Sequence, residues 1–376
     1  MKNNHTNIIV SSEMPEINIF SSAEMNDKDI NRHTISVSYP KHWFAPVELS
    51  TFAMTIEEVT INWMTSLGLV LTPKVLAHLR AMEPRHYAGY SHSMANYDHA
   101  LIYCKYITMW LLWDDERVEV ADDYMQVHVP LQALAGDNVD TQMSDPYIVA
   151  FKYIGDEYER LGATREWRVR FATSMMEWAK HAVEEEIVRR KGSENQPNRS
   201  FMEAVKLRAV TVGIRPNSIP LERAVGIELL AEIPTDPDYK ALIDRAARIC
   251  CIVNDLVGVP KDIQNNQIKS NLVLYHRICF KTSLLESYHA ILDLHDQAID
   301  EYDKLAEKLL LKVDPDFRER LQTFISHIRY MDTGFGFWHR DCIRYQELVA
   351  VENKLAFCIS INERLDNFQN GNLKLV

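Results

Sequence analysis

Residues 110–119, WLLWDDERVE, join an aromatic, apolar run to a cluster of acids. Carboxylates at the end of an apolar helix cost free energy unless a cation neutralises them. Divalent metal ions are the leading candidates, because hard cations such as Mg²⁺ prefer carboxylate oxygens. Asp114 and Asp115 begin the cluster, and Glu119 lies one helical turn beyond Asp115 on the same side. A solvated acidic helix end is the ordinary alternative, so this stretch needs a second motif to support it.

Composition narrows the classes of protein that this chain can belong to. Its 376 residues are 47% hydrophobic and 25% charged, which is typical of a globular protein with a large core. The sequence contains no Gly-rich phosphate loop. The net charge of −12 argues against nonspecific nucleic-acid binding, which depends on a basic face. We therefore expect a small-molecule partner and no nucleic acid.

The sequence also indicates how the chain relates to membranes and what its cysteines do. No stretch approaches the ~18 uninterrupted apolar residues of a membrane span. The first twenty residues lack the apolar core of a signal peptide, so we expect a cytoplasmic protein. The six cysteines show no C-x-x-C spacing and lie in apolar helical patterns, so we expect them to be small buried hydrophobic residues.

Helical periodicity runs through almost every long segment, and strand-like alternation is nearly absent. The pattern predicts an all-α fold with a single domain of ten or more helices over residues 39–365. Residues 1–38 are predicted to form a flexible leader, and residues 366–376 a polar tail. The expected helices are 50–67, 74–82 with a break near Pro84, 94–113, 120–134, 146–161, 164–191, one that is capped at Ser200 and carries Arg208, 220–232, 238–263, 282–312, 315–331 and 334–362.

A second polar motif lies in the predicted helix 238–263. Asn254, Gly258 and Asp262 are spaced at i, i+4 and i+8, so they stack along one helix face. Asn254 directly follows the apolar run of residues 249–253, which predicts that its side chain is largely buried and needs a polar partner. The alternative is a helix that reaches the surface at residue 254 and turns polar there.

Two arginine-containing segments complete the set of candidate residues. Ser200 and Glu203 form a capping box for a helix that carries Arg208, and Gly213 predicts that this helix breaks soon afterwards. Arg344 and Tyr345 lie near the C-terminus. Each arginine alone is more often a surface residue, but together they supply forked donors suited to a phosphate.

With these motifs in order, the chain resembles a microbial, bacterial-type class I terpene synthase, also called a terpene cyclase. That family has an aspartate-rich motif, a diphosphate-sensing arginine on a broken helix, an N-D-x-x-S-x-x-x-E metal triad and a C-terminal Arg-Tyr pair. The similarity covers roughly residues 40–360. It implies a helical bundle around a central active-site cavity, with three Mg²⁺ ions as cofactors.

The resemblance also implies a role for each matching residue. The reaction would be Mg²⁺-dependent ionisation and cyclisation of farnesyl or geranylgeranyl diphosphate to a cyclic sesquiterpene or diterpene, with the enzyme acting as a monomer or homodimer. Thr211 and Val212 occupy the positions that follow the sensor. Catalysis is expected to depend on Asp114, Arg208, Asn254 and Asp262; metal binding on Asp114, Asp115, Glu119, Asn254, Gly258 and Asp262; and substrate binding on Arg208, Lys261, Arg344, Tyr345, Trp110, Val212 and Trp338.

The metal triad departs from the pattern of the family. Gly258 replaces the usual Ser or Thr, so one hydroxyl ligand is missing and a water molecule is expected in its place. Asp262 replaces Glu and is one methylene shorter. Pro260 removes a helix hydrogen bond within the triad and is expected to kink the segment.

Three other interpretations remain open. A chain-elongating prenyltransferase shares the fold and metals, but it would normally carry a second aspartate-rich motif. A di-iron carboxylate protein would use two E-x-x-H pairs, and the chain has these at residues 83–86 and 286–289. Pro84 disfavours the helix that the first pair needs. The third is a helical scaffold that retains the motifs without activity.

Overall fold

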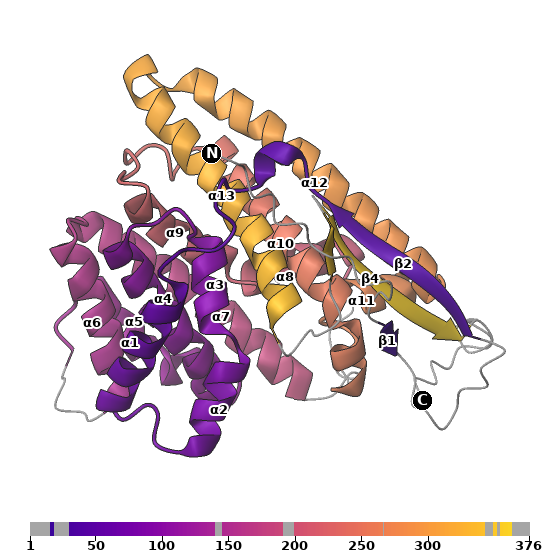
Figure 1. The fold of residues 1–376 in the computed structure, drawn as a ribbon, viewed down its shortest axis with the longest axis horizontal. Coiled ribbons are helices and arrows are strands. Elements are labelled where there is room, and N and C mark those ends of the chain that lie inside the picture. The colour runs from indigo at the N-terminus through magenta and orange to yellow at the C-terminus, as the bar shows by residue number, and fades with distance from the viewer. Residues whose placement is uncertain are drawn as a thin grey trace, which may run out of the picture.

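The computed structural model describes residues 16–18, 30–139, 145–190, 199–265, 267–342, 349–351 and 354–362. Helices account for most of these residues (Figure 1). The α-helices are α1 Ala53–Ser66, α2 Pro73–Ala81, α3 Pro84–Ser91, α4 Tyr97–Trp113, α5 His128–Ala135, α6 Pro146–Arg160, α7 Arg165–Arg190, α8 Phe201–Thr211, α9 Ile214–Ala224, α10 Pro237–Gln264, α11 Leu272–Phe280, α12 Leu284–Lys312 and α13 Pro315–Asp341.

Local sequence signals set many of the helix ends. The predicted capping box at Ser200 and Glu203 starts α8, and a second one at Ser283 and Glu286 starts α12. Asn96 caps α4 by accepting a hydrogen bond from the amide of residue 99. The mostly helical, single-domain prediction is confirmed.

Several helix boundaries differ from the prediction. Pro84 occupies the first turn of α3, where its missing N–H costs nothing, and so it starts a helix there. The helix expected at 220–232 instead begins at Ile214, directly after Gly213. Pro260 lies within α10, which continues to Gln264. The predicted helices 315–331 and 334–362 are replaced by one helix, α13, followed by strands.

A small sheet is the main departure from the all-helical expectation. Strands β2 (Ile30–Ser38) and β4 (Lys354–Asn362) pair antiparallel along their whole length, with Ile30 opposite Asn362 and Ser38 opposite Lys354. Strands β1 (Glu16–Asn18) and β3 (Val349–Val351) also pair with β4, parallel and antiparallel respectively. Residues 30–38 therefore belong to the sheet and not to a flexible leader, while the predicted tail at 366–376 lies outside the described residues.

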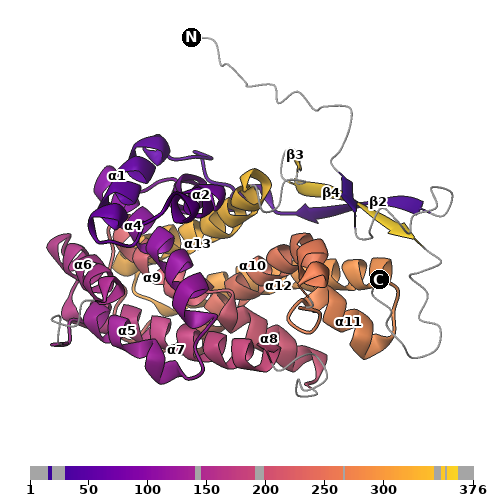
Figure 2. The same cartoon turned by 90° about the horizontal axis from the view of Figure 1, so that it is seen from below.

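The sheet packs beside α12, as both views show (Figures 1 and 2). The ring of Phe357 on β4 contacts Tyr288 of α12, and Tyr39, just after β2, contacts His295 of the same helix. Ile35, Val37 and Ile359 are buried in this contact layer. Apolar residues alternate with polar ones along residues 35–39, and this alternation is the signal that predicts a strand.

One hydrophobic core connects the helices. Within the described ranges, no helix is both long enough and apolar enough to cross a bilayer. Cys104, Cys250, Cys251 and Cys342 are buried, as predicted, whereas Cys279 is exposed near the end of α11 and contradicts that prediction. The described part of Cys358 does not include its side chain.

Candidate active site

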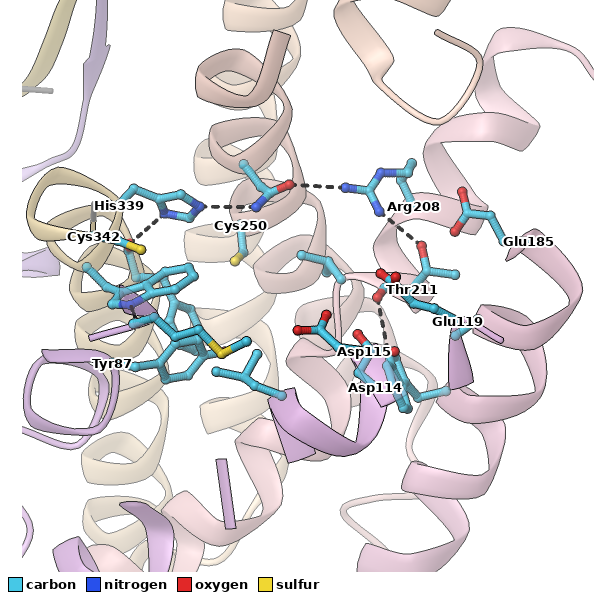
Figure 3. A pocket seen from close by; sticks show the side chains of 18 of the residues that line it. Tyr87, Asp114, Asp115, Glu119, Glu185, Arg208, Thr211, Cys250, His339 and Cys342 are labelled. Atoms are coloured by element: carbon cyan, nitrogen blue, oxygen red, sulfur yellow. Dashed lines mark hydrogen bonds between the residues drawn. The ribbon is translucent and has the colours of Figure 1, made fainter. Parts of the chain in front are cut away.

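A cavity of about 260 Å³ opens between α3, α4, α7, α8, α10 and α13. A second, more polar pocket of about 450 Å³ adjoins it and shares Glu119, Arg208, Asn254 and Lys261 with it. The cavity therefore has an aromatic, apolar side and a charged side. Figure 3 shows Asp114, Asp115 and Glu119 across the pocket from His339, Cys342 and Tyr87.

Asp114, Asp115 and Glu119 lie together as the sequence predicts, but the backbone that carries them is not a regular α-helix. Helix α4 continues directly into a π-helical turn, η3, over Asp114–Val118. The amide of Glu119 donates to the carbonyl oxygen of Asp114 at 2.9 Å, a hydrogen bond across five residues. Single π turns occur often at functional sites. Asp114, Asp115 and Glu119 all line the cavity, and we call these three residues the acid wall.

Asp115 has a specific partner outside this turn. Its Oδ2 lies 2.7 Å from Nε2 of His78 on α2. Arg117, two residues further on, is not its partner in these contacts: it lies 3.9 Å from Asp145 and over the ring of Tyr147. The position of Asp115 is therefore fixed by α2, and the pairing links the acid wall to a neighbouring helix.

The predicted triad on α10 forms the facing wall. Asn254 lines both pockets, Asp262 lines the polar one, and Gly258 is buried between them; we call these residues the amide wall. A Cβ atom built on Gly258 would lie 3.0 Å from Oδ2 of Asp262. The shorter acid therefore occupies the space beside the position from which a Ser side chain would extend. The two departures from the family motif are spatially coupled.

Asp262 is held in that place by amide groups. Nδ2 of Asn271, the buried N-cap residue of α11, donates to Oδ2 of Asp262 at 2.8 Å and also to the carbonyl oxygen of Asp255 at 2.8 Å. With the amide of Gln267 oriented to satisfy both neighbours, its nitrogen donates to Oδ1 of Asp262 at 3.0 Å and its oxygen accepts from Arg189 at 2.8 Å. Burial raises the pKa of Asp262 to about 6, although the hydrogen bond from Asn271 opposes this shift.

Arg208 lies in the last turn of α8 and lines both pockets. Its guanidinium donates to Asp255 in a forked contact, with NH2 to Oδ1 at 2.5 Å and Nε to Oδ2 at 3.2 Å. It also donates to Oγ1 of Thr211 at 3.1 Å and to Oδ1 of Asn254 at 3.4 Å. Burial opposes the charged form, but the carboxylate of Asp255 outweighs this and raises the pKa of Arg208 well above its ordinary value.

Asp255 is a site residue that the sequence interpretation did not assign. It is 1% exposed, and its Oδ2 also accepts from the amide of Leu272 at 2.9 Å. Its side chain faces Arg208 and the start of α11. Asp255 directly follows Asn254 on a helix, and adjacent helical residues face different neighbours. This adjacency is the sequence signal from which a separate role for Asp255 could have been predicted.

The predicted helix break lies next to the cavity. Gly213 has a φ of +82° between α8 and α9, and a Cβ there would lie 2.6 Å from the ring of Trp110. The indole Nε1 of Trp178 on α7 donates to the carbonyl oxygen of Thr211 at 2.9 Å. Glycine is required at this break by both its conformation and the close approach of Trp110.

This packing corrects the expected place of Trp110. Among the described residues, the cavity lining includes Trp178 but not Trp110, which packs one layer behind and meets Trp178 edge to face at 4.7 Å. Periodicity along α4 placed Trp110 on the same side as Asp114, but it could not show which α7 residue lies in between. Val212 and Trp338, the other two predicted substrate-binding residues on this side, line the cavity.

Other lining residues come from helices that carry no recognised motif. Tyr87 contacts Phe335 and Trp338, with ring centroids 4.8 Å apart in each pair. Glu185 and Glu186 on α7 extend the acidic side, and burial raises the pKa of Glu186 while its ion pair with Arg189 opposes this shift. Sequence reasoning missed these residues, because α7 has no distinctive spacing of acids.

Two predicted residues cannot be placed. Arg344 and Tyr345 fall in residues 343–348, outside the described part of the chain. Lys261 lines both pockets.

The donor set of the two walls fits Mg²⁺. The candidate ligands are carboxylate and amide oxygens, and thiolate or imidazole ligands are not needed. In the described ranges, no three His, Cys, Asp or Glu side chains already cluster as a metal site. Mg²⁺ usually keeps several waters and binds through one or two carboxylates together with substrate phosphates, so two separated walls suit it. Within the same described residues, the pairs Glu83–His86 and Glu286–His289 belong to no such cluster either.

Comparison with known proteins identifies the family. Residues 105–301 match the family model described as terpene synthase family 2, C-terminal metal binding. Terpene synthase 1 from Tieghemostelium lacteum is 25% identical over 178 residues, which are 47% of this chain and 49% of that protein. The (+)-eremophilene synthase from Sorangium cellulosum is 27% identical over 132 residues, 33% of this chain and 39% of that protein. The chain thus matches about half or less of the length of these curated relatives.

Solved structures show the same fold. A structure of α-eudesmol synthase superimposes with a TM-score of 0.67 at 18% identity, covering 78% of this chain and 96% of that one. Hedycaryol synthase in complex with nerolidol gives a TM-score of 0.65 at 18% identity, covering 80% and 99%. The family model spans more than half of the sequence and includes the π turn, Arg208 and the whole of α10. The chain therefore belongs to terpene synthase family 2.

Proposed function

We propose that the protein ionises and cyclises a linear isoprenoid diphosphate with the help of Mg²⁺, and releases inorganic diphosphate. One observation carries this proposal: the acid wall and Asn254 of the amide wall line one cavity, which also has an apolar, aromatic side. The charged side suits a diphosphate with its metal ions, and the aromatic side suits a prenyl chain.

Different residues of the site would bind the metal ions and the diphosphate. Bound Mg²⁺ would supply neutralisation of the charge that develops on the leaving diphosphate. Asp114, Asn254 and Asp262 would hold the ions, with Asp115 and Glu119 close by, while Gly258 leaves one coordination place to water. Arg208 and Lys261 contact the diphosphate directly, because forked and point cations complement phosphate oxygens. Arg344 and Tyr345 are proposed to join them.

The apolar side must exclude water and stabilise a carbocation once the diphosphate has left. Aromatic faces do this through their quadrupole without trapping the cation covalently. Tyr87, Trp178, Phe335 and Trp338 provide such faces around the cavity. Val212 adds a backbone carbonyl at the helix break.

We infer that farnesyl diphosphate is the substrate. The relatives include an eremophilene synthase, and the structural neighbours include eudesmol and hedycaryol synthases, all named for sesquiterpenes. The cavity of about 260 Å³, which has both a charged and an aromatic side, is also at the small end of ligand sites, which favours a C15 chain over a C20 chain.

Incubation with C10, C15, C20 and C25 prenyl diphosphates and Mg²⁺, followed by mass spectrometry of the hydrocarbon extract, tests this proposal. A cyclic C15 product that requires Mg²⁺ is expected. A parallel reaction with added isopentenyl diphosphate separates cyclisation from chain elongation. Longer diphosphates as the product would overturn the cyclase, and no diphosphate release from any substrate would favour an inactive scaffold.

A further inference from the structure

The last turn of α13 contacts the amide wall through a histidine to which none of the motifs assigns a role. His339 is 2% exposed and lines the cavity. Its Nδ1 lies 2.7 Å from the carbonyl oxygen of Phe335, one turn earlier on the same helix. Its Nε2 lies 3.1 Å from the side-chain nitrogen of Asn254 on α10.

These two contacts fix the tautomer of the imidazole. A carbonyl oxygen can only accept a hydrogen bond, so Nδ1 must carry the proton in the contact with Phe335. In the neutral ring Nε2 is then an acceptor, and it can accept only from an N–H group. The side-chain atom of Asn254 that faces His339 must therefore be the amide nitrogen.

A contact on the other side of Asn254 leads to the same orientation. The guanidinium of Arg208 has donors and no acceptor, and its NH2 lies 3.4 Å from Oδ1 of Asn254. An acceptor on one side and a donor on the other leave a single arrangement of the amide that satisfies both. Asn254 therefore bridges His339 and Arg208, which Figure 3 shows on opposite sides of the pocket.

We propose that His339 is a positioning residue that aims the carbonyl oxygen of Asn254 at the metal. The amide nitrogen of an asparagine cannot bind Mg²⁺, so a flipped Asn254 would remove one ligand from the amide wall without changing the sequence of the triad. His339 prevents this flip by accepting from the nitrogen. The inference rests on the proposed role of Asn254 as a metal ligand, and it assigns no proton transfer to His339.

Three substitutions separate this role from simple packing. His339→Phe keeps a ring of similar size but has no acceptor. His339→Gln places an amide oxygen near the position of Nε2, and His339→Asn is the matched control, because its shorter amide reaches only near Nδ1. Mn²⁺ binding in the presence of inorganic diphosphate, followed by electron paramagnetic resonance, reports on the metal site without turnover. Melting temperatures without metal show whether each variant is folded.

We expect His339→Phe to weaken the apparent affinity for Mn²⁺ by about 10–100-fold, the usual loss when an orienting partner of a metal ligand is removed. His339→Gln should restore most of that affinity, and His339→Asn should not. Equal Mn²⁺ binding by wild type and His339→Phe would overturn the inference, as would a Gln variant as weak as the Phe variant. Absence of Mn²⁺ binding by the wild type would overturn it too.

A spectroscopic test applies even if His339→Phe does not fold. In protein labelled with ¹⁵N-histidine, the signals of His339 are those lost in His339→Gln. The inference requires a protonated Nδ1 and a bare Nε2, which is the less common tautomer of a free histidine side chain, and a proton on Nε2 contradicts it. Failure of the wild type to turn over any prenyl diphosphate, with the Mn²⁺ series as expected, would remove the proposed function and leave this positioning role intact.

Discussion

The two walls of the cavity are built in different ways. The acid wall takes its shape from the backbone, because a π turn at the end of α4 groups Asp114, Asp115 and Glu119. The amide wall lies on regular helix, and its shape comes from side chains of neighbouring helices that hold Asn254 and Asp262. Carboxylate charge is concentrated on the acid wall, whereas on the amide wall neighbouring side chains control the orientation of Asn254 and Asp262. Substitution of an acid-wall residue should therefore act directly. The amide wall should also respond to substitution of the residues that hold Asn254 and Asp262.

Removing charge from the acid wall should have the largest effect. Asp114→Asn is expected to lower the rate of diphosphate release by at least about 10³-fold, since a metal-binding carboxylate contributes several kcal/mol to stabilisation of the transition state. Glu116→Gln is the matched control, because Glu116 lies in the same turn, is exposed and contacts Tyr147 away from the cavity. A colorimetric diphosphate assay compares the two variants. Near-normal release by Asp114→Asn would place the metal elsewhere.

Breaking the contact between Arg208 and Asp255 should have the next largest effect. Arg208→Leu leaves Asp255 buried without its cationic partner, which should lower the free energy of unfolding by about 3–5 kcal/mol and reduce diphosphate release by about 100-fold. Arg208→Lys keeps the charge but loses the fork, so it should retain more stability than activity. Urea unfolding followed by circular dichroism measures the first effect. Unchanged stability in Arg208→Leu would show that Asp255 is not charged in the native state.

Lower pH should weaken metal binding by the amide wall. The pKa of Asp262 is about 6, so protons compete with metal below this pH, and the apparent affinity for Mg²⁺ should fall by about tenfold between pH 7 and pH 5. Calorimetric titration of Mg²⁺ with inorganic diphosphate at both pH values measures this, corrected for the ionisation of diphosphate itself. Asp262→Asn should weaken binding at pH 7 and lose this component of the pH dependence.

The same carboxyl group affects the stability of the metal-free protein with the opposite sign. Its pKa in the native state lies above the unfolded value of about 3.9, so the native state binds the proton more tightly. The free energy of unfolding should therefore decrease by about 2 kcal/mol as the pH rises from about 4 to about 6, and remain lower above that range. Asp262→Asn should remove this component. A variant with the same pH slope as wild type would assign the titration to another group.

The smallest effect is expected from restoring the family residue at Gly258. Gly258→Ser adds a hydroxyl that could bind metal, but its Cβ would meet Oδ2 of Asp262 at 3.0 Å and displace the carboxylate. We expect Gly258→Ser to lower the Mg²⁺ affinity a few-fold, and the double variant with Asp262→Glu to recover it. A double-mutant cycle in Mg²⁺ affinity measures this coupling. Additive effects would show that the two departures arose independently of each other's geometry.

Much of the fold and the site could be predicted from local sequence, because helix caps, breaks and i, i+4 spacing are local properties. Ser200 and Glu203 set the start of α8, and Gly213 its break. The pairing of the sheet could not be predicted this way, because β2 and β4 lie more than 300 residues apart in the sequence, although the alternation along residues 35–39 is a local signal for a strand. The contact between His339 and Asn254 and the position of Trp178 in front of Trp110 are likewise set by the packing of distant helices.

The most direct test is a crystal structure with Mn²⁺ and inorganic diphosphate, using anomalous scattering to locate the metal. We expect metal density on both walls, beside Asp114 on one side, and beside Asp262 and Oδ1 of Asn254 on the other. The diphosphate should lie between the walls, within reach of Arg208 and Lys261. Metal on one wall alone, or coordinated outside this cavity, would contradict it.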